Sequence, residues 1–216
     1  MKKFDLVIFD LDGTILDTLP DLSAAVNDAL ARRGLPGHTV EEYKKMVGNG
    51  VRNLCLQALG DPSEEVLEAS LRDFKNYYVS HIDVQTRPYA GMPELLRDLQ
   101  QAGTVVAVAS NKFIEGTRML CARFYPFIPD GCVLGETDGL PRKPEPDMLL
   151  QLKKPFPADA RCCMVGDSWT DVEAGKAARM ATVGVTWGYR RTDALLEAAP
   201  DIVVDNVDAL RRFLFE

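Results

Sequence analysis

Several residue types that build common functional sites are scarce in this sequence. It has only two histidines, and neither has the neighbours that a metal cluster or a catalytic triad requires. Its five cysteines form no Cys-x-x-Cys pair and, being odd in number, cannot all be disulfide-bonded. We therefore expect no zinc site and interpret the cysteines as small, buried apolar residues.

Long apolar stretches and an excess of positive charge are also missing. No apolar run approaches the roughly 20 residues that a membrane-spanning helix needs. Lys and Arg total 25 against 32 Asp and Glu, and the net charge of −7 disfavours nucleic acid and anionic membranes as partners. The opening Met-Lys-Lys is followed by an acid too soon for a secretory signal. We expect a cytoplasmic monomer or homodimer that acts on a small molecule.

Much of the sequence alternates between short apolar strands and helical stretches. With 46% hydrophobic residues among 216, the chain can bury a sizeable core. The expected strands are residues 4–9, 104–109, 132–134, 161–165, 182–185 and 202–204. This alternation predicts an α/β fold with a doubly wound, Rossmann-like parallel sheet.

Residues 18–86 have a helical pattern instead. Apolar residues recur at helix spacing in three stretches, residues 22–30, 51–59 and 67–78. Thr39 and Glu42 have the spacing of a capping box. Because this segment begins just after the first strand, we expect a helical cap domain inserted into a core of residues 1–17 and 87–216. Such a cap would act as a lid that excludes water.

Two carboxylates stand at the end of the first expected strand. In extended chain, residues two apart share a face, so Asp10 and Asp12 point into the same space. Like charges so close need a cation, a proton or a lysine nearby. Gly13 lets the backbone turn sharply after them. Taken alone, the segment is equally consistent with a solvated Asp-Gly turn.

Three further polar segments follow later in the chain. Ser110 and Asn111 come directly after an expected strand, and their hydroxyl and turn amides could hold phosphate oxygens. Lys143 lies in a proline-rich loop that restricts the backbone. Asp167 and Asp171 follow another strand and share a face if a helix begins there. Each is ordinary by itself, but parallel sheets bind ligands beyond their strand ends, so together they predict one site.

Together these motifs resemble those of the haloacid dehalogenase superfamily of phosphohydrolases. Its four ordered motifs are matched by Asp10-Leu-Asp12-Gly-Thr14, Ser110-Asn111, Lys143-Pro and Gly166-Asp167-Ser-Trp-Thr-Asp171. Within the superfamily, the chain looks most like phosphoglycolate phosphatases, whose local signatures resemble Asp17-Thr-Leu-Pro-Asp21, Val47-Gly-Asn-Gly-Val-Arg52, Pro88-Tyr-Ala-Gly91 and Thr186-Trp-Gly-Tyr189. Relatives that act on sugar phosphates, pyrophosphate or nucleotides share much of this pattern.

The resemblance implies a role for each catalytic residue. Asp10 would attack phosphorus and form an aspartyl phosphate that water then hydrolyses. Asp12 would protonate the leaving oxygen and later deprotonate the water. Ser110, the amide of Asn111 and Lys143 would stabilise the charge on the phosphoryl oxygens in the transition state.

A magnesium ion is the cofactor that the same residues imply. Asp10, Asp167 and the backbone carbonyl of Asp12 would hold Mg²⁺ in an oxygen shell completed by water and substrate phosphate. Asp171 would support that shell. Thr14 would orient the loop that binds the substrate.

A glycine-rich turn in the cap is the candidate for substrate recognition. The amides of Gly48, Asn49 and Gly50, with the guanidinium of Arg52, could bind a second anionic group such as a carboxylate. An ordinary turn between helices, with Arg52 on the surface, explains the same residues equally well.

These observations leave three functions open. The leading one is Mg²⁺-dependent hydrolysis of a small phosphorylated metabolite, with 2-phosphoglycolate as the first candidate substrate. A phosphosugar mutase or phosphatase, or a pyrophosphatase, on the same scaffold is the second. The third is a phospho-receiver domain without turnover, which the inserted helices and the position of Asp10 on the first strand disfavour.

Overall fold

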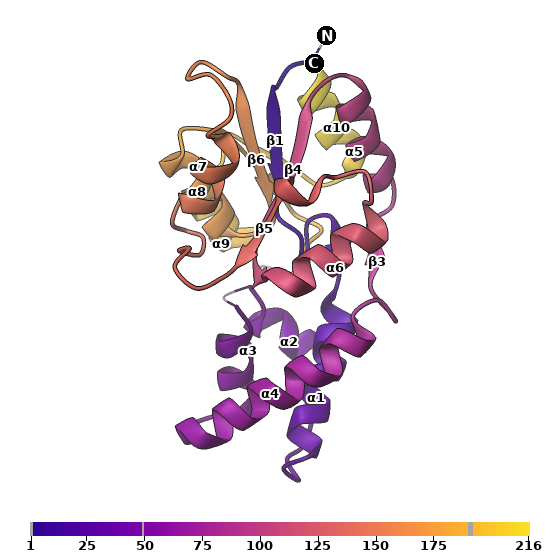
Figure 1. Ribbon diagram of the computed structural model, residues 1–216, viewed down its shortest axis with the longest axis vertical. Coiled ribbons are helices and arrows are strands. Elements are labelled where there is room, and N and C mark those ends of the chain that lie inside the picture. Colours follow the sequence, from indigo (N-terminus) through magenta and orange to yellow (C-terminus); the bar gives the residue numbers. More distant parts are fainter. Residues whose placement is uncertain (1, 49, 190–191) are drawn as a thin grey trace.

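A six-stranded parallel sheet forms the centre of the molecule, with helices on both faces and a helical segment at one end (Figure 1). The structure is a computed structural model, and it describes residues 2–48, 50–189 and 192–216. The strands lie in the order β5-β4-β1-β6-β7-β8. Their bounds are β1 Leu6–Phe9, β4 Val105–Phe113, β5 Val133–Glu136, β6 Cys162–Gly166, β7 Ala181–Val185 and β8 Ile202–Val204. The predicted fold class is confirmed.

The two faces of the sheet pack against different helices. Alternate residues of a strand point to opposite faces, so Val7 and Phe9 of β1 join one buried apolar cluster while Leu6 and Ile8 join another. The helices of the core are α5 Met92–Gln101, α6 Ile114–Phe124, α7 Asp147–Lys153, α8 Trp169–Ala177, α9 Thr192–Glu197 and α10 Val207–Phe215, with a 3₁₀ turn at Asp130–Cys132. Helices α5, α6 and α10 share the first cluster, and α7 and α8 share the second. This is the doubly wound arrangement.

Strand β4 runs further than its sequence suggests. The apolar run ends at Ala109, but the strand continues to Phe113, with an irregular register between these two residues. Ser110, Asn111 and Lys112 are polar yet buried. Polar residues do not predict a buried strand by themselves. The sequence therefore gives no sign that β4 continues here, since the residues that cover these three side chains come from other parts of the chain.

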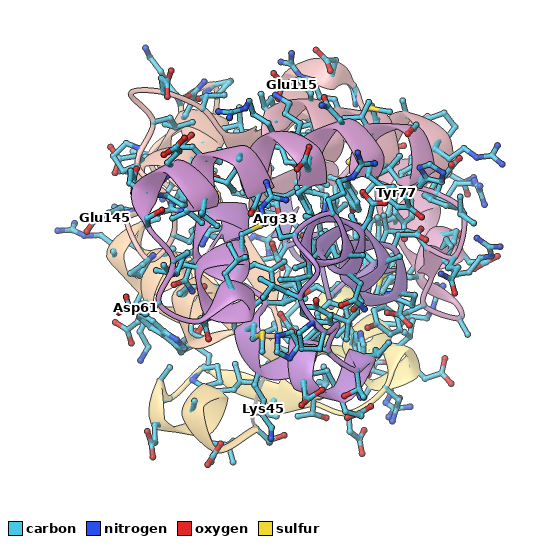
Figure 2. The ribbon with its side chains drawn as sticks, turned by 90° about the horizontal axis from the view of Figure 1, so that it is seen from below. Arg33, Lys45, Asp61, Tyr77, Glu115 and Glu145 are labelled. Carbon is cyan, nitrogen blue, oxygen red and sulfur yellow. The ribbon has the colours of Figure 1, made fainter. Side chains whose placement is uncertain are left out.

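Four helices lie between the first strand and the rest of the core: α1 Leu19–Ala31, α2 Val40–Met46, α3 Gly50–Leu59 and α4 Glu64–His81. The expected capping box is present, because Thr39 and Glu42 each accept a hydrogen bond from the other's backbone. Figure 2 looks at the molecule from this end, with the four helices in front of the sheet. We call α1–α4 the cap helices.

Two short strands connect the cap helices to the core. β2 (Leu16–Asp17) pairs antiparallel with β3 (Arg87–Pro88), so the outgoing and returning chains lie side by side. Buried Asp21 on α1 fastens the returning chain by accepting hydrogen bonds from the backbone of Gln85 and Thr86. These contacts fall near the boundaries predicted for the cap domain, which remain a prediction.

The described residues can be compared with two expectations from composition, which concern membrane-spanning helices and the state of the cysteines. None of the helices there is both long and apolar enough to cross a bilayer. All five cysteines are free thiols, four of them buried and Cys132 partly exposed.

Candidate active site

The carboxyl ends of β1, β4 and β6 meet at a cavity that the cap helices cover. Most of the residues singled out from the sequence line it: Asp10, Asp12, Ser110, Asn111, Lys143, Asp167 and Asp171. Cap residues such as Leu22, Leu54 and Phe74 form the opposite, apolar wall. Segments more than 100 residues apart in the chain therefore build one enclosed acidic site.

Lys143 lies between two of the buried carboxylates. Its Nζ donates to Asp10 Oδ1 at 2.8 Å, to Asp171 Oδ1 at 2.6 Å and to the carbonyl of Ala109 at 2.6 Å. Its side chain is only 2% exposed. An ion pair so well shielded from water fixes the positions of all three side chains.

Burial and charge act in opposite directions on these groups. Loss of water contact raises the pKa of Asp10 to about 7, with Asp171 and Asp12 adding to the rise and Lys143 opposing it. For Lys143, burial lowers the pKa, but the carboxylates of Asp10 and Asp171 outweigh it and hold the pKa above its ordinary value. The site thus keeps a charged lysine beside a carboxyl group that would prefer to be neutral.

Asn111 holds the lysine loop in place. Its side-chain oxygen accepts from the Lys143 backbone N–H at 2.9 Å, and its side-chain nitrogen donates to the Lys143 carbonyl at 2.9 Å. The same nitrogen reaches the Gly48 carbonyl at 3.4 Å. The Asn111 side chain therefore positions the Lys143 loop and reaches the cap segment at Gly48.

Asp12 has two protein partners that the sequence analysis did not assign. Lys112 Nζ lies 3.1 and 3.2 Å from its two carboxylate oxygens. The hydroxyl of Thr18 donates to Asp12 Oδ1 at 2.6 Å. Thr18 stands where the chain enters the cap helices, so the carboxylate of Asp12 touches the connection that a moving cap would bend.

Tyr189 connects the site to the same point of the cap. Its backbone N–H donates to Asp167 Oδ2 at 2.8 Å. Its hydroxyl donates to Asp17 Oδ1 at 2.9 Å and accepts from the backbone N–H of Leu19 at 3.0 Å and of Thr18. One residue thus holds a carboxylate of the site and the start of α1.

Three buried carboxylates form a group that fits a metal ion. One oxygen from each of Asp10, Asp167 and Asp171 lies within 4.8 Å of the others. The backbone leaves these carboxylates little other room: a Cβ built on Gly13 would lie 2.5 Å from Asp167 Oδ2, and one on Gly166 or Gly188 would also collide with an aspartate of the group. An all-oxygen donor set is the kind that hard divalent cations prefer.

Protein donors engage both carboxylate oxygens of Asp171. Oδ1 accepts from Lys143, and Oδ2 accepts from the backbone N–H of Ser168 at 3.0 Å. The second contact belongs to a capping box at the start of α8. Whether Asp171 supports the metal shell, as the sequence leads us to expect, stays a prediction.

The remaining candidates lie in different places. Gly48 and Gly50 line the cavity, whereas Asn49 lies outside the described residues. Arg52 is not among the described residues that line the cavity. It is 47% exposed and forms ion pairs with Glu64 and Glu68 on α4. Thr14 is fully buried beneath the site, and its carbonyl accepts from the indole of Trp187.

Neither Lys112 nor Tyr189 was given a role in this site from the sequence, although Tyr189 belongs to one of the signatures that resemble phosphoglycolate phosphatases. Lys112 follows Ser110 by two residues, so continuing the strand past Ala109 would have directed attention to it. Its burial, only 3% of the side chain being exposed, is visible only once the cap helices cover it. Nothing in the sequence connects Tyr189 with Thr18, because the contact joins residues 171 positions apart.

Comparison with known proteins agrees with this geometry. The family model for haloacid dehalogenase-like hydrolases matches residues 4–179. Phosphoglycolate phosphatase 1 of Pseudomonas aeruginosa is 37% identical, and the match covers 94% of this chain and 76% of the relative. Phosphoglycolate phosphatase of Agrobacterium fabrum is 35% identical, with 98% of this chain and 92% of the relative covered.

Solved structures show the same architecture. A protein from Lactobacillus delbrueckii subsp. bulgaricus superposes with a TM-score of 0.89 at 32% identity, and the match covers 100% of this chain and 99% of that one. The likeness therefore includes the cap helices as well as the sheet.

Proposed function

The chain belongs to the haloacid dehalogenase-like hydrolases, and we propose that it is a Mg²⁺-dependent phosphatase of small phosphate esters with 2-phosphoglycolate as its leading substrate. The proposal depends mainly on one observation: Asp10, Asp12, Lys143 and Asp167 line the same cavity at the ends of the central strands. The names of the two curated relatives support the choice of substrate.

Asp10 is the nucleophile in this proposal. Its carboxylate attacks phosphorus, the bond to the ester oxygen breaks, and an aspartyl phosphate forms. Lys143, 2.8 Å from Asp10 Oδ1, is placed to offset the charge that spreads over the phosphoryl oxygens. Ser110 and Asn111 line the same cavity, and the hydroxyl of Ser110 and the backbone amide of Asn111 would be further donors to these oxygens.

Asp12 is the acid and then the base. It gives a proton to the leaving ester oxygen and later removes one from the water that attacks the aspartyl phosphate, so that free phosphate and the regenerated carboxylate of Asp10 result. Its hydrogen bond from Thr18 orients the carboxylate. Covering by the cap helices keeps other water away from the phosphoenzyme.

The residues present suit a magnesium ion. Asp10, Asp167 and the backbone carbonyl of Asp12 would hold it, and it would supply positive charge to the phosphoryl oxygens. Asp171 would keep Lys143 in position beside this group. The cation would also lower the cost of holding Asp10 ionised.

The size of the cavity favours a small substrate. The volume of the cavity under the cap helices is about 50 Å³. A volume of this order, a few water-sized groups, is closer to a short phosphate ester than to a nucleotide.

A panel of esters tests this proposal. Phosphate release from 2-phosphoglycolate, glucose 6-phosphate, AMP and pyrophosphate is measured with Mg²⁺ and with EDTA, on wild type and Asp10→Asn. We expect hydrolysis of 2-phosphoglycolate to lead and to require both Mg²⁺ and Asp10.

Each alternative has its own outcome in the same panel. A preference for pyrophosphate or a sugar phosphate would replace the proposed substrate. Full activity in EDTA or in Asp10→Asn would overturn the chemistry itself. A stable phosphoenzyme without phosphate release would indicate a receiver domain.

A further inference from the structure

A second buried cation in the cavity, Lys112, has no part in the phosphoryl transfer proposed above for Asp10, Asp12 and Lys143. The side chain of Lys112 is 3% exposed, and its Nζ lies 3.1 and 3.2 Å from the two oxygens of Asp12. Its other close neighbour is the ring face of Tyr78, with the centroid 4.7 Å away. Tyr78 belongs to α4, so the closed cap places an uncharged aromatic face against the ammonium group.

Of the cations that described residues bring to the cavity lining, Lys112 is the one that remains for a substrate. Among the described lining residues, the lysines and arginines are Lys112 and Lys143. Lys143 is held by two carboxylates and a carbonyl on the side of the nucleophile. Arg52 pairs with two glutamates on the cap surface instead.

The position of Lys112 matches the geometry of a phosphorylated carboxylic acid. If Asp12 protonates the ester oxygen, that oxygen lies within hydrogen-bond distance of its carboxylate. In 2-phosphoglycolate one methylene separates this oxygen from the carboxylate, so the two oxygens are about 3–4 Å apart by ordinary bond lengths. A cation that contacts Asp12 therefore lies within reach of the substrate carboxylate.

We propose that Lys112 is a specificity-determining residue that binds the carboxylate of the leaving group, exchanging part of its contact with Asp12 for the substrate. The proposal rests on the proposed function and deepens it, because it names the substrate class as short phosphorylated carboxylic acids. It also assigns recognition to strand β4 of the core in place of the surface of the cap. The Tyr78 ring keeps the ammonium group in place without neutralising it.

A matched pair of esters isolates this role. 2-Phosphoglycolate and 2-hydroxyethyl phosphate have the same phosphate and the same first methylene. The next group is a carboxylate in 2-phosphoglycolate and an uncharged CH₂OH in 2-hydroxyethyl phosphate. We expect Lys112→Met to lower kcat/KM for 2-phosphoglycolate about 10- to 100-fold more than for 2-hydroxyethyl phosphate, the range of a charge-assisted hydrogen bond. Lys112→Arg, which keeps the charge, should restore part of the preference.

The ratio of the two substrates separates recognition from structural damage. Loss of the Asp12 partner or of packing would reduce both activities alike and leave the ratio unchanged. Lys75→Met is the matched control, because this lysine is 56% exposed on the same cap helix as Tyr78. Thermal unfolding of each variant checks that it folds.

Failure of the inference and failure of the proposed function give different results. Wild type that hydrolyses 2-phosphoglycolate, with equal losses on both esters in Lys112→Met, overturns the role of Lys112 alone. Selective loss in Arg52→Ala instead would also overturn it. Wild type that prefers esters without a carboxylate overturns both proposals.

Discussion

Replacing the nucleophile should stabilise the metal-free protein at high pH while it removes activity. The pKa of Asp10 is raised from 3.8 to about 7, chiefly because burial disfavours its charge. At about 1.4 kcal/mol per pKa unit, holding this carboxylate ionised costs the folded state about 4 kcal/mol. Asn has nearly the same shape and no charge, so Asp10→Asn relieves most of that cost.

The direction in which stability changes with pH depends on whether the folded or the unfolded state binds the Asp10 proton more tightly. Between pH 3.8 and about 7 the folded protein binds more protons at Asp10 than the unfolded chain does. The contribution of Asp10 to the free energy of unfolding of wild type therefore falls as pH rises through this window and levels off above it. Relative to wild type, Asp10→Asn should gain about 3 kcal/mol between pH 5 and pH 8.

Urea denaturation in EDTA at pH 5 and pH 8 measures this difference. For a chain of 216 residues, about 3 kcal/mol corresponds to roughly 6–12 °C in Tm. The control is Asp159→Asn, an exposed acid whose replacement should change nothing between the two pH values. A variant less stable than wild type at pH 8, or an effect independent of pH, would refute the reasoning.

Two further substitutions test contacts around the site. Tyr189→Phe removes the hydroxyl that holds Asp17 and Leu19. We expect the free energy of unfolding, measured by urea denaturation, to fall by about 1–3 kcal/mol and kcat to fall as well. If both values stay unchanged, Tyr189 does not connect the site to the cap. Arg52→Ala breaks exposed ion pairs, so it should lower the free energy of unfolding by less than about 1 kcal/mol. The ratio of kcat/KM for the carboxylated ester to kcat/KM for the neutral ester should stay unchanged. A selective loss on the carboxylated ester would place Arg52 in substrate recognition.

The sheet could be predicted from the sequence because its signal is local. An apolar run of four to six residues needs burial on both faces wherever it lies, and parallel strands joined by helices provide it. The same holds for the capping box of Thr39 and Glu42, whose contacts lie three residues apart. Residues such as Asp10 and Asp167 were found because they stand at the ends of such strands.

The contacts that were not predicted join distant segments. Lys112 meets Asp12 across 100 positions, and its neighbour Tyr78 belongs to a helix whose placement no local pattern specifies. Arg52 has a glycine-rich turn beside it that suggests anion binding, yet its partners on α4 lie 12 and 16 residues further on. The chemistry of each residue could be inferred, but the identity of its partner depends on how the cap helices pack.

The most direct test of the mechanism is to identify the residue that carries the phosphoryl group. Enzyme mixed with Mg²⁺ and 2-phosphoglycolate is quenched in acid during turnover, reduced with borohydride and digested for mass spectrometry, since reduction converts an aspartyl phosphate to homoserine. We predict homoserine at position 10 in wild type and at no other aspartate. Homoserine at a different position, or turnover with no trapped intermediate and direct transfer to water, would contradict capture of phosphorus by Asp10.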